Sequence, residues 1–334
     1  MVVDEPNLPR VAAASRRTRR LLASLALVCA GCASGPAPID SDALAEAQLL
    51  EEAERALAAG DVDRAIDASE ELLERTSDGK KRQGALYFAA EARLADDSPV
   101  KAFRHYQSLL RDFPWSSYVP RCEQPVWEIG SSYISEEPWF LFGDLFNGRE
   151  RGAEVMREFA ASFPSSPRAP DAIAAIAGYR FSRKEFAEAQ LHYARLAKSY
   201  PDSEWADLAA FRRAECWQLG ARGAAYDTTP LLRAARDYRR YLSERPRGER
   251  RAAAEAAARD VDQQIALGEL LRARLYLVRE EEPGARLHLA NVVLAYPDTA
   301  AAATARSLLA ERGWDLSIHS VDTLQAPPLE EFGG

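Results

Sequence analysis

A recurring ladder of small residues and prolines constrains this chain more than any other feature of its sequence. Five segments of thirteen residues, among them AFRHYQSLLRDFP from Ala102 and AQLHYARLAKSYP from Ala189, begin with alanine and carry apolar residues at helical spacing. Four of them end in proline, the first ends in Ser77, and a further proline-ended copy begins at Gly152. In four copies another alanine lies twelve residues before the first. Because proline cannot continue a helix, each copy predicts two helices that pair at the small residues.

Single helix pairs of this kind cannot bury their apolar faces, so several must stack to form one continuous core. The ladder resembles the tetratricopeptide repeat, and we expect an all-α tetratricopeptide-repeat superhelix of about five helix pairs, with an extra helical segment after the second repeat. Hydroxyl side chains two places after the prolines suit the N-caps of the helices that follow. These residues are Ser116, Ser166, Ser203 and Thr299.

The beginning of the chain has the pattern of a bacterial export signal. A basic cluster at residues 16–20 precedes the apolar run Leu21–Ala30, which is about half of the length that spans a bilayer. The triplet Ala30-Gly31-Cys32 then resembles the lipobox of bacterial lipoproteins, which implies cleavage before Cys32 and a covalent lipid on its thiol. Cys29 and Cys32 also form a C-x-x-C pair, but a redox or metal site would need a folded shell that a cleaved segment lacks.

The charge balance disfavours nucleic-acid partners. The whole chain has a net charge of −8, and cleavage after residue 31 removes five arginines and two acids, which leaves −11. Such a chain lacks the excess of Lys and Arg that binds phosphates, and its acidity also opposes adsorption to anionic lipid. The lipid on Cys32 is therefore the expected link to the membrane.

Apolar residues on the first helices of the pairs are candidates for binding a polypeptide in the groove of the superhelix. The alternative is that they complete the core between helices, and the sequence does not separate the two. They are Leu50, Leu57, Tyr87, Leu94 and Phe181.

A second candidate contact is the aromatic segment at residues 136–152, EEPWFLFGDLFNGRERG, which interrupts the ladder. It is too short to span a membrane, but if exposed it would form a large apolar patch of the kind that marks a contact site. Three interpretations stay open: the segment caps the groove between neighbouring helix pairs, contacts a protein partner, or inserts into a membrane surface. Its large side chains include Trp139, Phe140, Phe142 and Phe146.

No motif indicates an enzyme, a cofactor or a metal site. The chain has no phosphate-binding loop, Gly-rich dinucleotide turn, H-E-x-x-H or G-x-S-x-G. His105, His192 and His288 occupy equivalent places in different repeats, so they cannot converge on one ion, and we expect them to face solvent. Cys122 and Cys216 are expected to be buried and unpaired on separate helices, although the environment of an exported protein would allow them to pair.

Three longer stretches carry a more specific resemblance. They are YPDSEWADLAAFRRAECW at 200–217, AYDTTPLLRAARDYRRYLSERP at 225–246, and the repeat at 271–310. These stretches resemble the BamD (ComL-type) lipoproteins of the outer-membrane β-barrel assembly machine, and the likeness covers nearly all of residues 41–312. The aromatic segment is not part of the family's pattern.

The resemblance implies a non-catalytic scaffold, held by its lipid at the periplasmic face of the outer membrane. It also implies that repeats at 41–121 receive unfolded barrel proteins. Repeats at 203–312 would dock on the barrel-forming insertase and its accessory lipoproteins. The rival interpretation is a periplasmic repeat lipoprotein that organises cell-wall synthesis or cell division, which would need no barrel insertase.

Under either interpretation the chain divides in the same way. The expected parts are a signal peptide at 1–31, a lipidated linker at 32–40, N-terminal repeats at 41–121, a helical insert with the aromatic segment at 122–167, C-terminal repeats at 168–312, and a flexible tail at 313–334.

Overall fold

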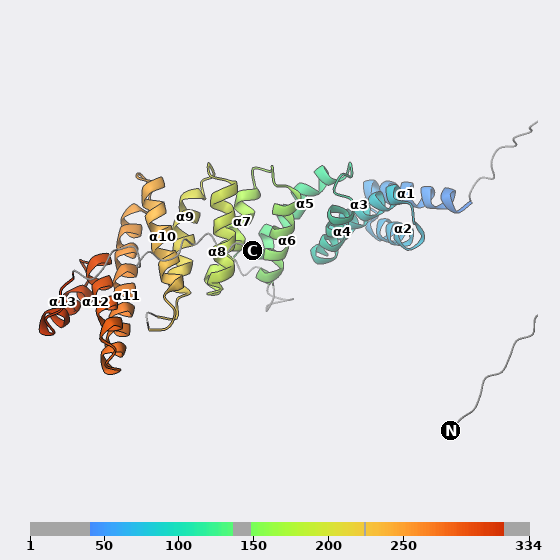
Figure 1. Ribbon diagram of the computed structural model, residues 1–334. Coiled ribbons are helices and arrows are strands. Elements are labelled where there is room, and N and C mark those ends of the chain that lie inside the picture. Colours follow the sequence, from blue (N-terminus) through green and yellow to red (C-terminus); the bar gives the residue numbers. More distant parts are fainter. Residues whose placement is uncertain (1–40, 136–147, 224, 317–334) are drawn as a thin grey trace, which may run out of the picture. The chain divides into compact units, whose positions relative to one another are not determined.

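The computed structural model describes residues 41–135, 148–223 and 225–316, which form thirteen α-helices and, within these ranges, no strand (Figure 1). The helices are α1 (Ser41–Ala59), α2 (Val62–Arg75), α3 (Gly79–Ala95), α4 (Pro99–Asp112), α5 (Val119–Ile134), α6 (Gly148–Ser162), α7 (Ala169–Ser182), α8 (Phe186–Ser199), α9 (Ala206–Leu219), α10 (Thr229–Glu244), α11 (Arg251–Val278), α12 (Glu282–Ala295) and α13 (Ala300–Glu311).

Contacts between Cα atoms divide the chain into two units, Met1–Leu44 and Ala45–Gly334. Of the first unit the structure describes only the opening turn of α1. In the second unit each helix from α2 to α12 packs against the next one along the chain, and α11 also contacts α9 and α13. The second unit is therefore an array of consecutive helix hairpins, the tetratricopeptide-repeat arrangement that the ladder predicts.

The small residues of the ladder lie where the two helices of a pair approach each other. Both members of each pair are fully buried, so the helices have no room for a larger side chain there. The second helices end two residues before the prolines, as α4 does at Asp112 before Pro114. These observations confirm the predicted register. The paired alanines are Ala53 and Ala65, Ala90 and Ala102, Ala177 and Ala189, and Ala273 and Ala285.

The extra helical segment expected at 122–167 contains a helix pair of its own, α5 and α6, which pack against each other. Gly152 of α6 takes the ladder position. A Cβ atom at Gly152 would lie 2.5 Å from the backbone nitrogen of Ile134 and 2.8 Å from its Cα, so only glycine allows this approach. The described part of the array therefore has six helix pairs and a final single helix, α13.

The predicted N-caps after the prolines are confirmed in one case and wrong in the others. Thr299 caps α13 by accepting a hydrogen bond from the backbone N–H of Ala302 at 3.2 Å. Ser116, Ser166 and Ser203 instead lie two residues ahead of the true N-cap residues of α5, α7 and α9. The reason is an isolated turn before each helix, in which the serine carbonyl accepts a bond from the residue three places on.

The longest helix of the array, α11, belongs to two hydrophobic cores. Val261 and Ile265 pack in one core with side chains of α10, whereas Ala266 and Leu270 pack in the next core with α12 and α13. Its 28 residues correspond to about 42 Å. None of the described helices is both long and apolar enough to cross a membrane.

The two cysteines of the repeats behave as expected from the sequence. Cys122 on α5 and Cys216 on α9 are free and buried. Burial raises the pKa of each thiol to about 12, so both stay protonated at neutral pH and are poor nucleophiles.

Candidate partner-binding surfaces

Three of the predicted groove residues lie together at the start of the array. Leu50 and Leu57 of α1 and Tyr87 of α3 are half-buried and pack around one small core. A Cβ atom at Gly84 of α3 would lie 2.8 Å from Leu50 Cδ1, so α1 and α3 fit closely here. The three side chains thus contribute to the contact between helices, and the binding of a polypeptide by their exposed parts stays a prediction.

Tyr87 belongs to an aromatic face with a cation above it. Its ring stacks on Tyr118 with the centroids 4.9 Å apart, and the guanidinium of Arg121 lies 6.0 Å from Tyr87 and 5.8 Å from Tyr118. Burial raises the pKa of Tyr87 to about 12, so its hydroxyl stays neutral. The face offers a polypeptide flat aromatic area beside an exposed positive charge.

The other two predicted groove residues lie elsewhere, packed against the largest core. Leu94 is at the end of α3, and Phe181 is at the end of α7. The ring of Phe181 lies 5.4 Å from Phe186, and the guanidinium of Arg212 lies 4.3 Å from its centroid. Phe181 is therefore half-buried among its neighbours, and the five predicted residues do not form one continuous site.

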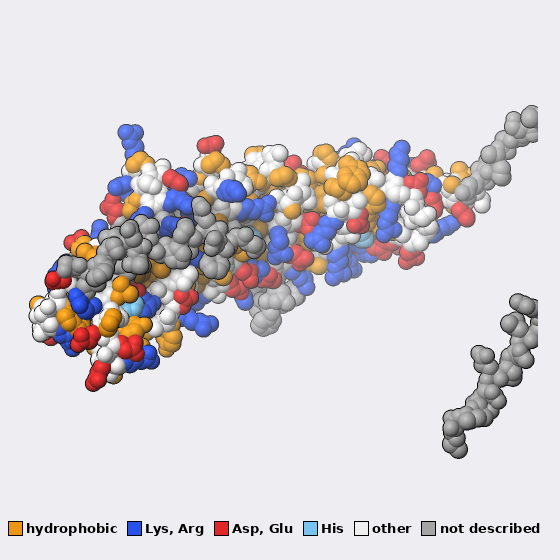
Figure 2. Space-filling model, viewed as in Figure 1, with side chains coloured by type: hydrophobic (Ala, Val, Ile, Leu, Met, Phe, Trp, Pro, Cys, Tyr) orange, Lys and Arg blue, Asp and Glu red, His pale blue; other side chains and the backbone are white. Residues whose placement is uncertain are grey.

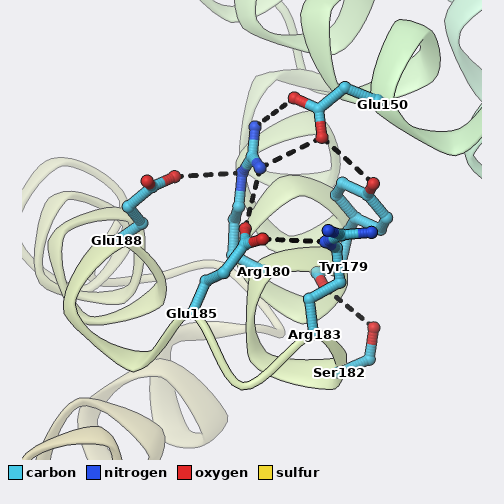
Figure 3. Close-up of polar contacts among 7 residues, drawn as sticks. All are labelled: Glu150, Tyr179, Arg180, Ser182, Arg183, Glu185 and Glu188. Carbon is cyan, nitrogen blue, oxygen red and sulfur yellow. Dashed lines mark hydrogen bonds and ion pairs between the residues drawn. The ribbon is translucent and has the colours of Figure 1, made fainter. Parts of the chain in front are cut away.

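A polar network beside Phe181 ties three helices together (Figure 3). Arg180 of α7 points among three acids: its Nη1 lies 3.1 Å from Glu150 of α6 and 2.8 Å from Glu185, and its Nε lies 3.2 Å from Glu188 of α8. Tyr179 donates a hydrogen bond to Glu150 at 3.0 Å.

Hydrogen bonds and ion pairs within this network favour the charged forms of its side chains. Burial by itself raises the pKa of Glu150, but hydrogen bonds from Arg180 and Tyr179 outweigh burial, and the pKa is lowered. Burial likewise acts to lower the pKa of Arg180, whereas its bonds to Glu185 and Glu150 raise it above the ordinary value. With Arg180 only 11% exposed, the network fixes α6, α7 and α8 against each other rather than offering a site.

The predicted solvent exposure of the histidines is wrong. His105 and His192 are half-buried between helices, and burial lowers the pKa of both, that of His192 to about 4. His288 Nδ1 lies 2.7 Å from Glu269 Oε2. The neighbouring helix covers this repeat position, which the sequence pattern does not show. Among the described residues, no three His, Cys, Asp or Glu side chains gather where they could hold a metal ion.

Several predicted sites lie outside the described residues. They are the lipidated Cys32 and the aromatic side chains Trp139, Phe140, Phe142 and Phe146. Their predicted roles stay predictions.

An apolar stripe is exposed on the second half of α11. Its members are 37–83% exposed, and their spacing places them on one face of the helix. Figure 2 shows hydrophobic side chains among charged ones over α11 and α12. Apolar area of this kind commonly marks a contact surface. The stripe of α11 consists of Leu267, Leu271, Leu275 and Val278.

Sequence reasoning missed this stripe because α11 has two apolar faces. Ile265, Leu270 and Ala273 also recur at helical spacing, and they form the buried face. Periodicity finds both faces and does not tell which one is covered. An exposed leucine every fourth residue, at Leu267, Leu271 and Leu275, was the available signal.

One family model matches more than half of the chain. The family model described as YfiO, outer membrane lipoprotein, matches residues 150–323. No curated protein matches the chain. Among solved structures, PilF of Pseudomonas aeruginosa is 14% identical over 81% of this chain and 99% of its own, with a TM-score of 0.25. A tetratricopeptide-repeat protein of Parabacteroides merdae is 14% identical over 80% of this chain and 98% of its own, with a TM-score of 0.31.

The family match begins in α6 and extends through α13, so it includes the apolar stripe of α11. It covers just over half of the chain. This protein is therefore a tetratricopeptide-repeat member of the YfiO, or BamD, family of outer membrane lipoproteins.

Proposed function

We propose that this protein is a non-catalytic, lipid-anchored scaffold of outer-membrane β-barrel assembly, and that the apolar stripe of α11 docks on the barrel-forming insertase. Membership of an outer membrane lipoprotein family supports the location, and an array of helix hairpins supports a role in protein–protein interaction. The observation that carries the docking surface is the exposure of Leu267, Leu271, Leu275 and Val278 within the matched residues.

The dimensions of the stripe suit a protein partner. From Leu267 to Val278 the helix rises about 16 Å. Complete burial of one such side chain is worth about 1.5–3 kcal/mol, so several half-exposed side chains supply a strong centre for an interface. Accessory lipoproteins of the same machine would bind at other parts of the C-terminal repeats.

The N-terminal repeats are proposed to receive unfolded barrel proteins. Tyr87, Tyr118 and Arg121 present aromatic area and one positive charge close to the first helix. Such a face suits extended polypeptides with aromatic side chains. The lipid on Cys32 and the linker at 32–40 would hold these repeats near the periplasmic surface of the outer membrane.

Photo-cross-linking in cells tests the docking surface. A photoreactive phenylalanine analogue placed at Leu275 is expected to capture an outer-membrane barrel protein with periplasmic domains, identified by mass spectrometry. The matched control is Leu191 of α8, which is also exposed but lies outside the stripe. Capture of cell-wall synthases at Leu275, with no such barrel protein, would favour the rival role in cell-wall synthesis. Equal capture of the barrel protein at both positions would remove the argument for the stripe.

A further inference from the structure

A basic recess is lined by residues of α8, α9 and α10. Figure 1 shows that these three helices are consecutive in the array. Its volume is about 280 Å³, at the lower end of the range for ligand pockets. A recess of this size accommodates a side chain or two of a larger partner rather than a whole cofactor. It is lined by Gln190 and Ala194 of α8, Arg213 and Trp217 of α9, and Arg233, Arg236, Asp237 and Arg240 of α10.

The recess has a strong excess of positive charge. Asp237 supplies the single carboxylate among its lining residues and is already shared by two arginines. Arg213 Nε lies 3.1 Å from Asp237 Oδ2, and Arg236 Nε lies 3.6 Å from Oδ1. Four guanidiniums therefore surround one buried carboxylate, an excess of three positive charges in a chain whose net charge is −8.

Two of the guanidiniums have little internal compensation. Arg233 lies over the ring of Trp217, 4.7 Å from its centroid; Asp227 interacts with it electrostatically, but no carboxylate of the described residues forms an ion pair with it. The nearest acid to Arg240 is the exposed Glu244, at 4.0 Å. Arg213 is already held by the buried Asp237, so Arg233 and Arg240 are the guanidiniums left to bind an anionic ligand.

The surroundings favour a peptide over a small anion. Planar guanidiniums bind both carboxylates and phosphates, so charge alone does not decide. However, Trp217 and Ala194 give the recess apolar walls. Exposed Leu232 lies four residues from Arg236 on α10, so it neighbours a lining residue on its helix face. An acidic peptide with apolar side chains would use both features, whereas inorganic phosphate would use only the charges.

We infer that this recess binds carboxylate side chains of an acidic, partly apolar segment of a partner protein. The inference goes beyond the proposed docking of α11, because the recess involves different helices, α8 to α10, and a different chemistry. An experiment can therefore contradict one of the two proposals without affecting the other.

The test measures binding of a defined probe to the full-length protein in detergent micelles. The probe is a fluorescein-labelled peptide of sequence GELEELEG, followed by fluorescence anisotropy at low salt. The double change Arg233→Gln and Arg240→Gln is expected to weaken binding at least about tenfold, because charge-assisted hydrogen bonds to the peptide are lost. The control Arg239→Gln removes one positive charge from α10 outside the recess, as each of the two single changes does within it, and is expected to change affinity less than about twofold.

Two further measurements test whether binding depends on the carboxylates of the probe and whether it involves the stripe of α11. A probe with glutamine in place of every glutamate is expected not to bind, and Leu271→Asp in the stripe of α11 is expected to leave probe binding unchanged. Thermal unfolding followed by circular dichroism checks that every variant is folded. Equal binding of the glutamine probe, or equal losses with Arg239→Gln, would overturn the inference.

Two other ligands of the recess, a phospholipid headgroup and the C-terminal tail of this chain, would each give a different result. If vesicles containing phosphatidylglycerol bind in a manner that depends on Arg233 and Arg240 while the peptide does not bind, the ligand is a phosphate headgroup and the inference is wrong. If the probe binds only after residues 317–334 are removed, the acidic tail of the chain itself is the occupant, and the assignment to a partner protein falls.

Discussion

The hydroxyl of Tyr241 donates a hydrogen bond to Asp207 Oδ1 at 2.8 Å and accepts one from the backbone N–H of Arg250 at 3.1 Å. Arg250 Nη1 in turn lies 2.8 Å from Asp207 Oδ2. One phenol thus joins α9, α10 and the start of α11.

We predict that Tyr241→Phe lowers the free energy of unfolding by about 1–2 kcal/mol, because Asp207 and the N–H of Arg250 lose a buried partner. Urea unfolding followed by circular dichroism measures the change. Tyr226→Phe is the control, since Tyr226 is 79% exposed, and it is expected to have no effect. Equal stability of the two variants would contradict the role assigned to this hydroxyl.

Gly152→Ala is predicted to destabilise the array by about 1–3 kcal/mol, because the new methyl would overlap the backbone of Ile134. Gly178→Ala on α7 is the matched control. A Cβ atom there has no neighbour within 4 Å, and alanine is the better helix former, so this change is expected to be neutral or to stabilise by up to about 1 kcal/mol. Calorimetry of both variants checks the sign. A neutral Gly152→Ala would show that α5 and α6 do not approach so closely.

The double change Leu271→Asp and Leu275→Asp is predicted to reduce co-purification of a barrel insertase at least about tenfold, since charged groups would enter an apolar contact. Both positions are solvent-exposed, so the melting temperature is expected to stay within a few degrees of that of the unmodified protein. Leu191→Asp on α8 is the control. Undiminished recovery of the insertase with the α11 variant would place the docking surface elsewhere.

His192 is predicted to make the array less stable as the pH falls from about 6.5 to about 4. Burial, with smaller contributions from Arg157, Arg180 and Arg195, lowers the pKa of His192 from 6.5 to about 4. The unfolded state therefore binds more protons than the folded state in this window, and stability is lost as the pH falls through it. The ring is partly exposed, so the effect is on the order of 1 kcal/mol.

The change His192→Gln tests this dependence. Urea unfolding at pH 7 and pH 4.5 is expected to show a smaller loss of stability in the variant than in the unmodified protein, because glutamine does not titrate. The same loss in both proteins would assign the pH dependence to other groups.

Cys32→Ala is predicted to abolish incorporation of radioactive palmitate in cells, whereas Cys29→Ala is predicted to retain it. The reason is that the lipobox places the lipid on the cysteine that follows Ala30 and Gly31. Gel fluorography of the immunoprecipitated chain measures the label. Label persisting in Cys32→Ala would locate the anchor at another residue.

Features that repeat along the chain were predictable from the sequence. Ala102 and Ala189 predicted closely paired helices because their spacing recurs, and both are fully buried. The break at Pro114 followed from the missing N–H of proline. The family resemblance, drawn from stretches such as 200–217, agrees with the match to residues 150–323.

Features that depend on neighbouring helices were not predictable. Ser166 has the chemistry of an N-cap, but the turn before α7 shifts the cap by two residues. His192 looks like a surface residue in its own helix, and a second helix covers it. Leu50 and Phe181 were equally compatible with a groove and with a core, since the pattern does not report which neighbour lies above a half-buried side chain.

The shared position of α11 in two cores has a mechanical consequence. A force applied at the end of α13 cannot detach the α11–α12 hairpin alone. The reason is that Val261 and Ile265 also hold α11 in the core of the preceding hairpin. We expect the segment from α9 to α13 to yield in one cooperative rupture under tension. A partner that pulls on α12 would thereby load two hairpins and the final helix.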